Sequence, residues 1–203
     1  MGGRLEAAHR AREVGLASCR QAVRLAGSSI RAIHREQPDR AAALLGECEA
    51  AVRAAQEALA PFPAVAYAGF LHDAEKELAE AALTAALVAG AALPTPEQLA
   101  VGVPAWLNGL AEAASELRRH LLDRLREGRT DRAEALLAAM EDVYESLVAI
   151  DYPDVVTAGL RRSADALRAV LERTRSDVTT TVLQQRLQRV IETRLGGGPP
   201  DPA

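Results

Sequence analysis

The feature that most constrains the fold of this chain is an apolar repeat at alternating intervals of three and four residues near its N-terminus. The repeat consists of Leu16, Cys19, Val23, Ala26, Ile30 and Ile33. Such spacing places one narrow apolar seam along an α-helix, as in coiled coils. A second segment, which stops before Pro61, repeats this rhythm with Leu45, Cys48, Val52, Ala55 and Leu59. We therefore expect two long antiparallel helices, the first ending at Pro38.

The remainder of the chain is also expected to be helical. Hydrophobic residues make up 49% of the sequence and aromatic residues only 3%, so the apolar content is mostly Ala, Leu and Val, which suits helix packing better than sheets. Long helices are predicted over residues 64–92, 104–128, 130–150 and 157–194, with a capped turn at 95–98. We expect the third helix to be buried on all sides after Glu80, where its residues are apolar or Thr.

The predicted fold class is therefore all-α, a single-domain antiparallel bundle of about six to seven helices. The domain is expected to span residues 1–195, and the tail over 196–203 is predicted to be disordered because it is rich in Gly and Pro. Every stretch of about 18 residues that is largely apolar also contains charged residues, and the first residues lack the charged-then-apolar pattern of a secretory signal. We therefore expect a cytoplasmic protein with no membrane partner.

Charge and cysteine content narrow the function classes. Lys and Arg number 24 against 28 Asp and Glu, a net charge of −4, which excludes a protein whose whole surface clamps nucleic acid. This net charge does not exclude a basic stripe on one part of the surface. Cys19 and Cys48 have neither CxxC spacing nor a His pair nearby, so both are predicted to be core residues rather than zinc ligands.

Two acidic pairs are candidate metal ligands. Glu77 and Glu80 are three residues apart and Glu112 and Glu116 are four apart, so each pair shares one helix face. The second pair lies in an apolar stretch, where an unpaired carboxylate must reach solvent, become protonated, meet a cation or bind a metal. Four carboxylates converging from two helices favour Mg²⁺ or Mn²⁺, ions that take oxygen ligands and accept substrate phosphate. This arrangement indicates phosphoryl chemistry.

The alternative is that these acids are solvated helix faces or partners of Arg118 and Arg119. A ferritin-like di-iron site is not expected, because neither Glu pair is followed by the His of a Glu-x-x-His motif. His72 and His120 lie beside the two acidic stripes. Each is a candidate general acid or phosphate ligand, and the alternative for each is a surface or interface residue.

A basic stripe is predicted on the first helix. Arg20, Arg24, Arg31 and Arg35 lie within about 60° of one another on a helix with about 100° per residue, and His34 adjoins them. The stripe is a candidate for phosphate tracking, and the alternative is an ordinary solvated face. Because aromatic residues are scarce, any grip on RNA is expected to be mainly electrostatic.

Several segments in this order resemble one known family. They are SCRQAVRLAGSSIRAIHRE near the N-terminus, KELAEA at 76–81, WLNGLAEAASELRR at 106–119, and IDYPDVVTAGLRRSADALRAVLERTRSDVT at 150–179. Together they resemble translin and translin-associated factor X (TRAX), and most of all the prokaryotic TRAX-like proteins. The resemblance implies a helical bundle that assembles as a homo-octamer around a closed cavity. In the TRAX branch, cavity-facing carboxylates carry a Mg²⁺-dependent endoribonuclease activity on single-stranded RNA.

In this resemblance, Glu77 and Glu80 match the two acidic positions of the QE-x-VEA-like segment of the TRAX branch. Glu116 matches the acidic position of its GEL-like segment. Glu112 stands where the branch usually has Asp, and Ser115 stands where it usually has Gly, as in the non-catalytic translin branch. Retention of the acidic set favours a nuclease in which all four glutamates hold one or two Mg²⁺ ions and are catalytic. The arginine stripe and His34 would then bind single-stranded RNA, with single-stranded DNA as a second candidate ligand.

Two other functions stay open from the sequence. The first is a translin-type nucleic-acid-binding protein whose acids are structural pairs, which would bind RNA regardless of Mg²⁺. The second is a helical scaffold without a nucleic-acid role, whose arginines meet only the carboxylates of partner proteins.

Overall fold

The computed structural model describes residues 2–195, so the predicted tail over 196–203 lies outside the described residues. These residues form nine helices and no strand: α1 (Gly2–His34), α2 (Pro38–Leu59), α3 (Pro63–Ala66), α4 (Phe70–Ala89), α5 (Pro96–Leu99), α6 (Val103–Arg126), α7 (Thr130–Val148), α8 (Asp154–Thr157) and α9 (Leu160–Leu195). The all-α prediction is confirmed. The two helices beyond the predicted number, α3 and α8, are single turns.

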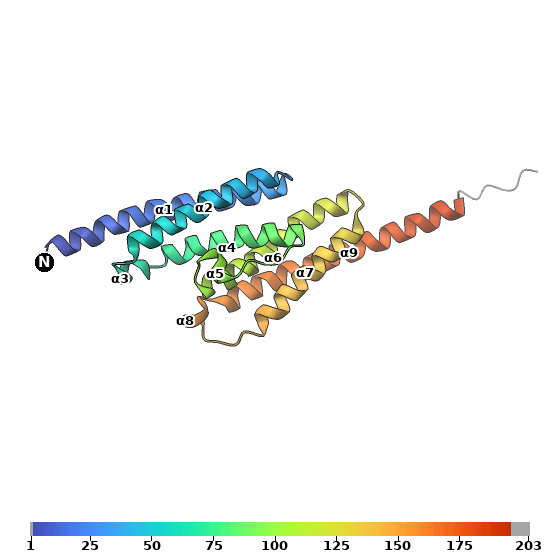
Figure 1. The fold of residues 1–203 in the computed structure, drawn as a ribbon. Helices are drawn as coiled ribbons and strands as arrows, with labels where there is room; N and C mark the ends of the chain where they lie inside the picture. Colours follow the sequence, from blue (N-terminus) through green and yellow to red (C-terminus); the bar gives the residue numbers. More distant parts are fainter. Residues whose placement is uncertain (1, 196–203) are drawn as a thin grey trace, which may run out of the picture.

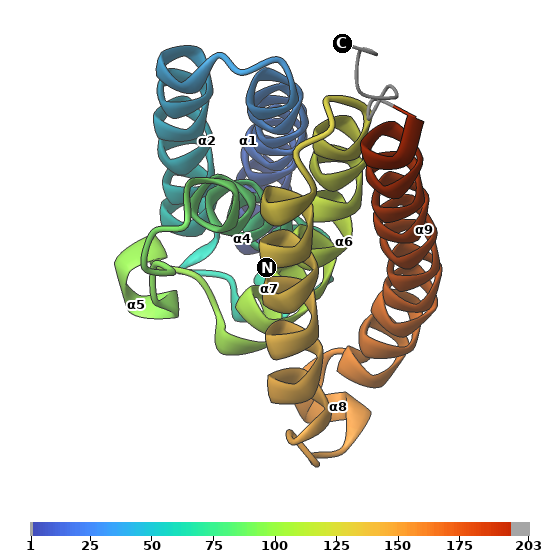
Figure 2. The same ribbon diagram turned by 90° about the vertical axis from the view of Figure 1, so that its right-hand side faces the viewer.

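The long helices pack in three layers (Figures 1 and 2). The α1–α2 hairpin covers α4, α4 packs on α6, and α6 packs on α7 and α9. The helices α4 and α6 are therefore the central pair, and any group on their facing sides is held by both outer layers. None of the described helices combines the length and apolarity that crossing a bilayer requires.

The N-terminal hairpin follows the predicted seams with one shift. Cys19, Ala26, Ile30 and Ile33 are buried as predicted, but Val23 is 39% exposed and its neighbour Ala22 is fully buried instead. The small side chain of Ala22 lets α2 approach closely, since Cys48 Sγ lies 3.3 Å from Ala22 O. Both cysteines are free and buried, as predicted.

The predicted third helix over 64–92 is wrong as one element. The chain forms the single turn α3, breaks at Gly69 with φ +100°, and starts again as α4 at Phe70. Gly90 then ends α4 in the left-handed conformation that commonly closes helices. Burial on all sides holds only for Ala81–Thr84, because the last turn of α4 is partly exposed.

The start of the last helix also differs from the prediction. Ala158 and Gly159 both have positive φ, so α8 stops at Thr157 and α9 begins at Leu160. The predicted cap at Thr95 is confirmed, with its side chain accepting from Gln98 N and the Gln98 side chain accepting from Thr95 N.

Candidate metal centre and nucleic-acid interface

The helices α4 and α6 bring three predicted site residues together. Glu77 and Glu80 on α4 and Glu112 on α6 each offer one carboxylate oxygen, and these three oxygens lie within 4.8 Å of one another. We call this group the carboxylate cluster. Glu80 is only 9% exposed, whereas the Glu77 and Glu112 side chains are 27% and 38% exposed. The cluster is therefore buried at its base and open to solvent on one side.

Gly109 sets the distance between the two helices that form the cluster. A Cβ atom at this position would lie 2.8 Å from Lys76 O and 3.0 Å from Glu80 N, both backbone atoms of α4. Because backbone cannot move aside as a flexible side chain can, only glycine permits this approach. The contact lies one turn before Glu112 on α6, so it brings that carboxylate to the level of Glu77 and Glu80.

Lys76 is the site residue that the sequence analysis missed. Its Nζ lies 2.7 Å from both carboxylate oxygens of Glu112 and 3.4 Å from Glu77 Oε1. Burial alone lowers the pKa of Lys76, but the hydrogen bond and charge of Glu112 outweigh that effect, so the pKa is raised. A signal was present in the sequence, because residues four apart on a helix, such as Lys76 and Glu80, share one face.

One ammonium does not neutralise the carboxylate cluster. Burial, together with the neighbouring charges of Glu112 and Glu77, raises the pKa of Glu80 to about 8. Burial also raises the pKa of Glu77, with Glu112 contributing in the same direction. Carboxylates that resist ionisation because they face each other are typical of sites that gain from a bound cation.

Glu116, the fourth predicted ligand, is held by a different partner. His34 Nε2 donates to Glu116 Oε2 at 2.7 Å, and this bond lowers the pKa of Glu116. The His34 side chain is only 3% exposed, whereas the arginines that it adjoins are exposed. The contact joins the end of α1 to α6 beside the cluster, since the charge of Glu116 reaches Glu80.

The residues present fit a divalent, oxygen-preferring cation. The three converging carboxylates offer only oxygen ligands, which Mg²⁺ and Mn²⁺ prefer. When its three acids are ionised, the cluster and the Lys76 ammonium carry a net charge of minus two, which one divalent ion would cancel. Neither His nor Cys belongs to this group in the described part of the chain, which disfavours zinc.

The four arginines of the predicted stripe are exposed, three of them on α1 and the fourth directly after its last residue. They are Arg20, Arg24, Arg31 and Arg35. Within residues 2–195 none of them forms an ion pair with a carboxylate, and the Arg31 guanidinium only donates to Ser28 Oγ at 2.8 Å. By helix geometry His34 lies about 40° from the edge of the stripe. The stripe is thus available to an anionic ligand and borders the contact between His34 and Glu116.

Other predicted candidates lie outside the cluster. Arg118 pairs with Asp177 at 2.7 Å instead of with an acidic pair, whereas the charge of Arg119 helps to lower the pKa of Glu116. His120 is buried, and burial lowers its pKa, with Arg124 adding to the effect. Ser115 donates to Ala111 O at 3.0 Å within α6, so its hydroxyl bonds to its own helix. His72 is partly exposed and belongs to no described cluster.

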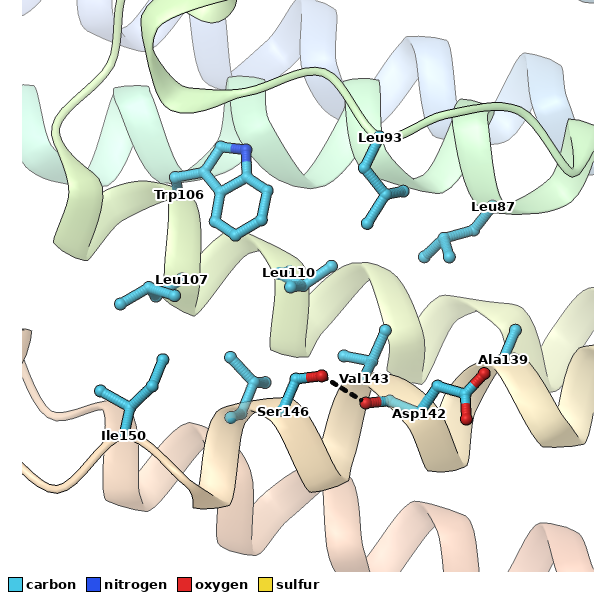
Figure 3. Close-up of a pocket in the computed structure, with 11 residues that line it drawn as sticks. Leu87, Leu93, Trp106, Leu107, Leu110, Ala139, Asp142, Val143, Ser146 and Ile150 are labelled. Carbon is cyan, nitrogen blue, oxygen red and sulfur yellow. Dashed lines mark hydrogen bonds between the residues drawn. The ribbon is translucent and has the colours of Figure 1, made fainter.

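An apolar pocket of about 430 Å³ lies outside the cluster, between the end of α4, the chain that follows it and the helices α6 and α7 (Figure 3). Trp106 forms part of its wall and donates from Nε1 to Pro94 O at 2.9 Å. The polar lining residues are Asp142 and Ser146, and Ser146 Oγ bonds back to Asp142 O. A single carboxylate in an apolar wall offers no convergent chemistry, so this pocket is not the candidate site.

Comparisons with known proteins place this architecture among solved structures. AfC3PO bound to duplex RNA is 34% identical, with a TM-score of 0.82 over 90% of this chain and 94% of that chain. A second AfC3PO structure is 33% identical, with a TM-score of 0.82 over 90% and 95%. Apo-NeC3PO shares the fold at a TM-score of 0.81 over 89% and 94%, with 18% identity.

Sequence comparison adds one curated relative. An uncharacterised protein of Methanocaldococcus jannaschii is 32% identical over 137 residues, which are 65% of this chain. The match spans 60% of the length of that relative. No protein-family model matches the chain.

Proposed function

Because this chain belongs to the translin/C3PO family, we propose that it is a metal-dependent endoribonuclease that cleaves single-stranded RNA. The observation that carries the proposal is the carboxylate cluster, where oxygens of Glu77, Glu80 and Glu112 converge within 4.8 Å from two helices. A family member, AfC3PO, forms a complex with duplex RNA, which supports RNA as the ligand class. Cleavage of the RNA and a preference for single strands are proposed in addition to RNA binding.

Glu77, Glu80 and Glu112 would hold the metal, Mg²⁺ or Mn²⁺. When bound, such an ion lowers the pKa of a coordinated water and stabilises charge that develops on the phosphate oxygens. Glu80 forms the buried base of the site, and Glu77 and Glu112 form its open side. Glu116 is held by His34 and acts as a positioning residue at the border between α1 and α6.

The arginine stripe on α1 would position the RNA backbone. Phosphate contacts fix the register of a nucleic acid and carry no sequence information, so we propose binding without base selectivity. Arg31 and Arg35 lie within one turn of His34, which itself contacts α6 beside the cluster. We propose that a strand bound along the stripe extends past this contact to the carboxylates. Single-stranded DNA presents the same phosphates, so we propose it as a second ligand of the stripe.

We propose that the active form is a homo-octameric hollow particle in the cytoplasm, as the family resemblance implies. The end of α9 supports self-association, because Leu183, Leu187, Val190 and Ile191 are 45–60% exposed. Such a run of apolar residues on one extended helix is typical of a surface that another copy covers.

A non-catalytic RNA-binding protein is the second candidate function. The ion pair between Lys76 and Glu112 favours it, because an ammonium bound to both oxygens of Glu112 also suits a purely structural acid. In that case the protein would bind RNA with equal affinity in EDTA and in Mg²⁺.

Variants of matched charge test the proposal. End-labelled single-stranded RNA and the corresponding duplex would be incubated in Mg²⁺ with wild type, Glu112→Gln and Glu141→Gln, the last being a control in an ion pair with Arg175 on the outer helices. We expect cleavage of the single strand by wild type and by Glu141→Gln, and a loss of at least about 100-fold in Glu112→Gln. Equal rates for all three proteins would contradict the proposal.

A further inference from the structure

We infer that Lys76 is a built-in cation of the carboxylate cluster, which restricts the cluster to one divalent ion per chain. The inference rests on the proposed function, because it assumes that the cluster binds a metal. It concerns the number of ions, which three carboxylates alone leave open between one and two.

The identity of residue 76 is the first observation. The chain contains 24 Lys and Arg residues, and Lys76 is its single lysine. Arginine presents a planar fork of donors, whereas lysine carries a compact point charge on a flexible stem. The space between two carboxylates suits the compact cation, because an ammonium is closer in shape to a coordinated ion than a guanidinium is.

The position of the Lys76 ammonium is the second observation. Nζ lies 2.7 Å from Glu112 Oε1, 2.7 Å from Glu112 Oε2, and 3.4 Å from Glu77 Oε1. The ammonium thus lies between the helices, against both oxygens of Glu112 and near one oxygen of Glu77. Because a bridging ion needs about 2.0–2.1 Å to the same oxygens, the ammonium and that ion exclude each other.

The charge balance is the third observation. When ionised, Glu77, Glu80 and Glu112 carry three negative charges, and Lys76 reduces the sum to minus two. One divalent ion then neutralises the group, and a second would leave two uncompensated positive charges in a partly buried site. Glu116 does not alter this balance, since it is paired with His34.

The remaining coordination follows from these contacts. Glu80 at the buried base would hold the divalent ion together with Glu77 and Glu112, because each carboxylate oxygen that accepts from Nζ keeps a second lone pair. Lys76 also holds Glu112 in place before the ion arrives, so it is a positioning residue for that ligand. Removal of Lys76 would free the second position.

The number of Mn²⁺ ions bound per chain tests the inference. Mn²⁺ binding would be measured by isothermal titration calorimetry and by electron paramagnetic resonance of free Mn²⁺, in wild type, Lys76→Met and Lys76→Gln. The inference predicts one ion in wild type and two in both variants, with the first ion bound at least about tenfold more tightly than in wild type. One ion in the variants, or two in wild type, would overturn it.

Two further proteins serve as controls. The Arg175→Gln substitution removes a cation from an exposed ion pair on the outer helices. The protein that carries it should still bind one Mn²⁺ ion. The double variant Lys76→Met with Glu112→Gln removes both partners together, which tolerates folding better than breaking one side of a pair, and it should return to one ion. Two ions in the double variant would count against the inference.

Failure of this inference and failure of the proposed function give different results. If wild type and the Lys76 variants each bind one Mn²⁺ and wild type cleaves RNA, only the role of Lys76 is wrong. If none of these proteins binds Mn²⁺, the metal centre itself is wrong, and the proposed function falls with it.

Discussion

His34 at the end of α1 donates from Nε2 to Glu116 Oε2 on α6 at 2.7 Å. This contact spans 82 residues of sequence and links the outer hairpin, which carries the arginine stripe, to the central helix that carries Glu112. It also withdraws Glu116 from the other acids, since only Glu77, Glu80 and Glu112 converge in the described chain.

Replacement of Glu116 should therefore affect metal binding less than replacement of Glu80. We expect Glu80→Gln to weaken Mn²⁺ binding more than about tenfold, since even outer-shell partners contribute about 10–100-fold, and Glu116→Gln to change it less than about threefold. Titration calorimetry of the two variants provides the comparison. Equal losses in both would make Glu116 a ligand, as the four-carboxylate prediction had it.

Loss of the histidine should lower stability. His34 is almost fully buried, and removing one partner of a buried charged hydrogen bond costs about 1–3 kcal/mol. Urea unfolding of His34→Ala should show that decrease, and unfolding of Glu116→Gln a smaller one, because the amide oxygen still accepts the bond. A His34→Ala protein as stable as wild type would mean that this contact does not support the fold.

The close approach at Gly109 gives a second prediction. In Gly109→Ala the new methyl group would meet backbone atoms of α4 at about 2.8 Å, so α4 and α6 must separate. We expect a loss of about 1–3 kcal/mol in the free energy of unfolding, as for other overpacked cores, together with weaker Mn²⁺ binding.

Gly46→Ala is the matched control for this substitution. Gly46 lies on the exposed face of α2, and a Cβ there meets nothing within 4 Å. Because alanine favours the helix more than glycine does, this variant should be more stable by about 0.5–1 kcal/mol. If both alanine variants gained stability, the packing argument at Gly109 would be refuted.

The sequence allowed much of the fold to be predicted, because amphipathic spacing and helix caps are local signals. The seam on α2 and the capping box at Thr95 are examples. The break at Gly69 and the positive φ of Ala158 were not predicted, because an apolar helical pattern continues across both points and tertiary packing decides where the chain turns.

The sequence indicated acids that share a helix face, but not the partners that contact them. Helical spacing indicated which carboxylates share a face, and the structure brings Glu77, Glu80 and Glu112 together. The pairing of Lys76 with Glu112 and of His34 with Glu116 depends on which helices are neighbours. Spacing within one helix carries no information about that arrangement.

The metal-free protein should lose stability as pH rises. Burial and the charges of Glu112 and Glu77 together raise the pKa of Glu80 from an ordinary value of 4.5 to about 8. The folded chain therefore binds a proton that the unfolded chain releases between these values, so this contribution to stability is complete below about pH 4.5 and is lost as pH rises through 8. One pKa unit corresponds to about 1.4 kcal/mol, so Tm in EDTA should fall by at least about 4 °C between pH 5 and pH 8.

Glu80→Gln isolates this effect, because its amide does not titrate. Thermal unfolding in EDTA, followed by circular dichroism at several pH values, should give a flatter Tm profile for the variant than for wild type. Profiles of equal slope would show that Glu80 is not the group responsible.

The arginine stripe should determine the salt dependence of RNA binding. Each phosphate contact contributes about 0.7 to the slope of log affinity against log salt for a single strand. Replacement of Arg24 and Arg31 by Gln should reduce that slope by about 1.4, measured by fluorescence anisotropy in EDTA. The same change at Arg168 and Arg173, two exposed positions on α9, is the control, and an equal reduction there would argue against a specific stripe.

The most direct test of a metal-dependent ribonuclease is the single-turnover cleavage rate of a bound RNA as a function of Mg²⁺ concentration. With protein in excess, binding and cleavage of an end-labelled single strand would be followed in the same samples. We predict that the rate rises to saturation with Mg²⁺ and is abolished by EDTA while the RNA stays bound. RNA that stays bound and intact at every Mg²⁺ concentration would contradict the nuclease and leave a translin-type binding protein.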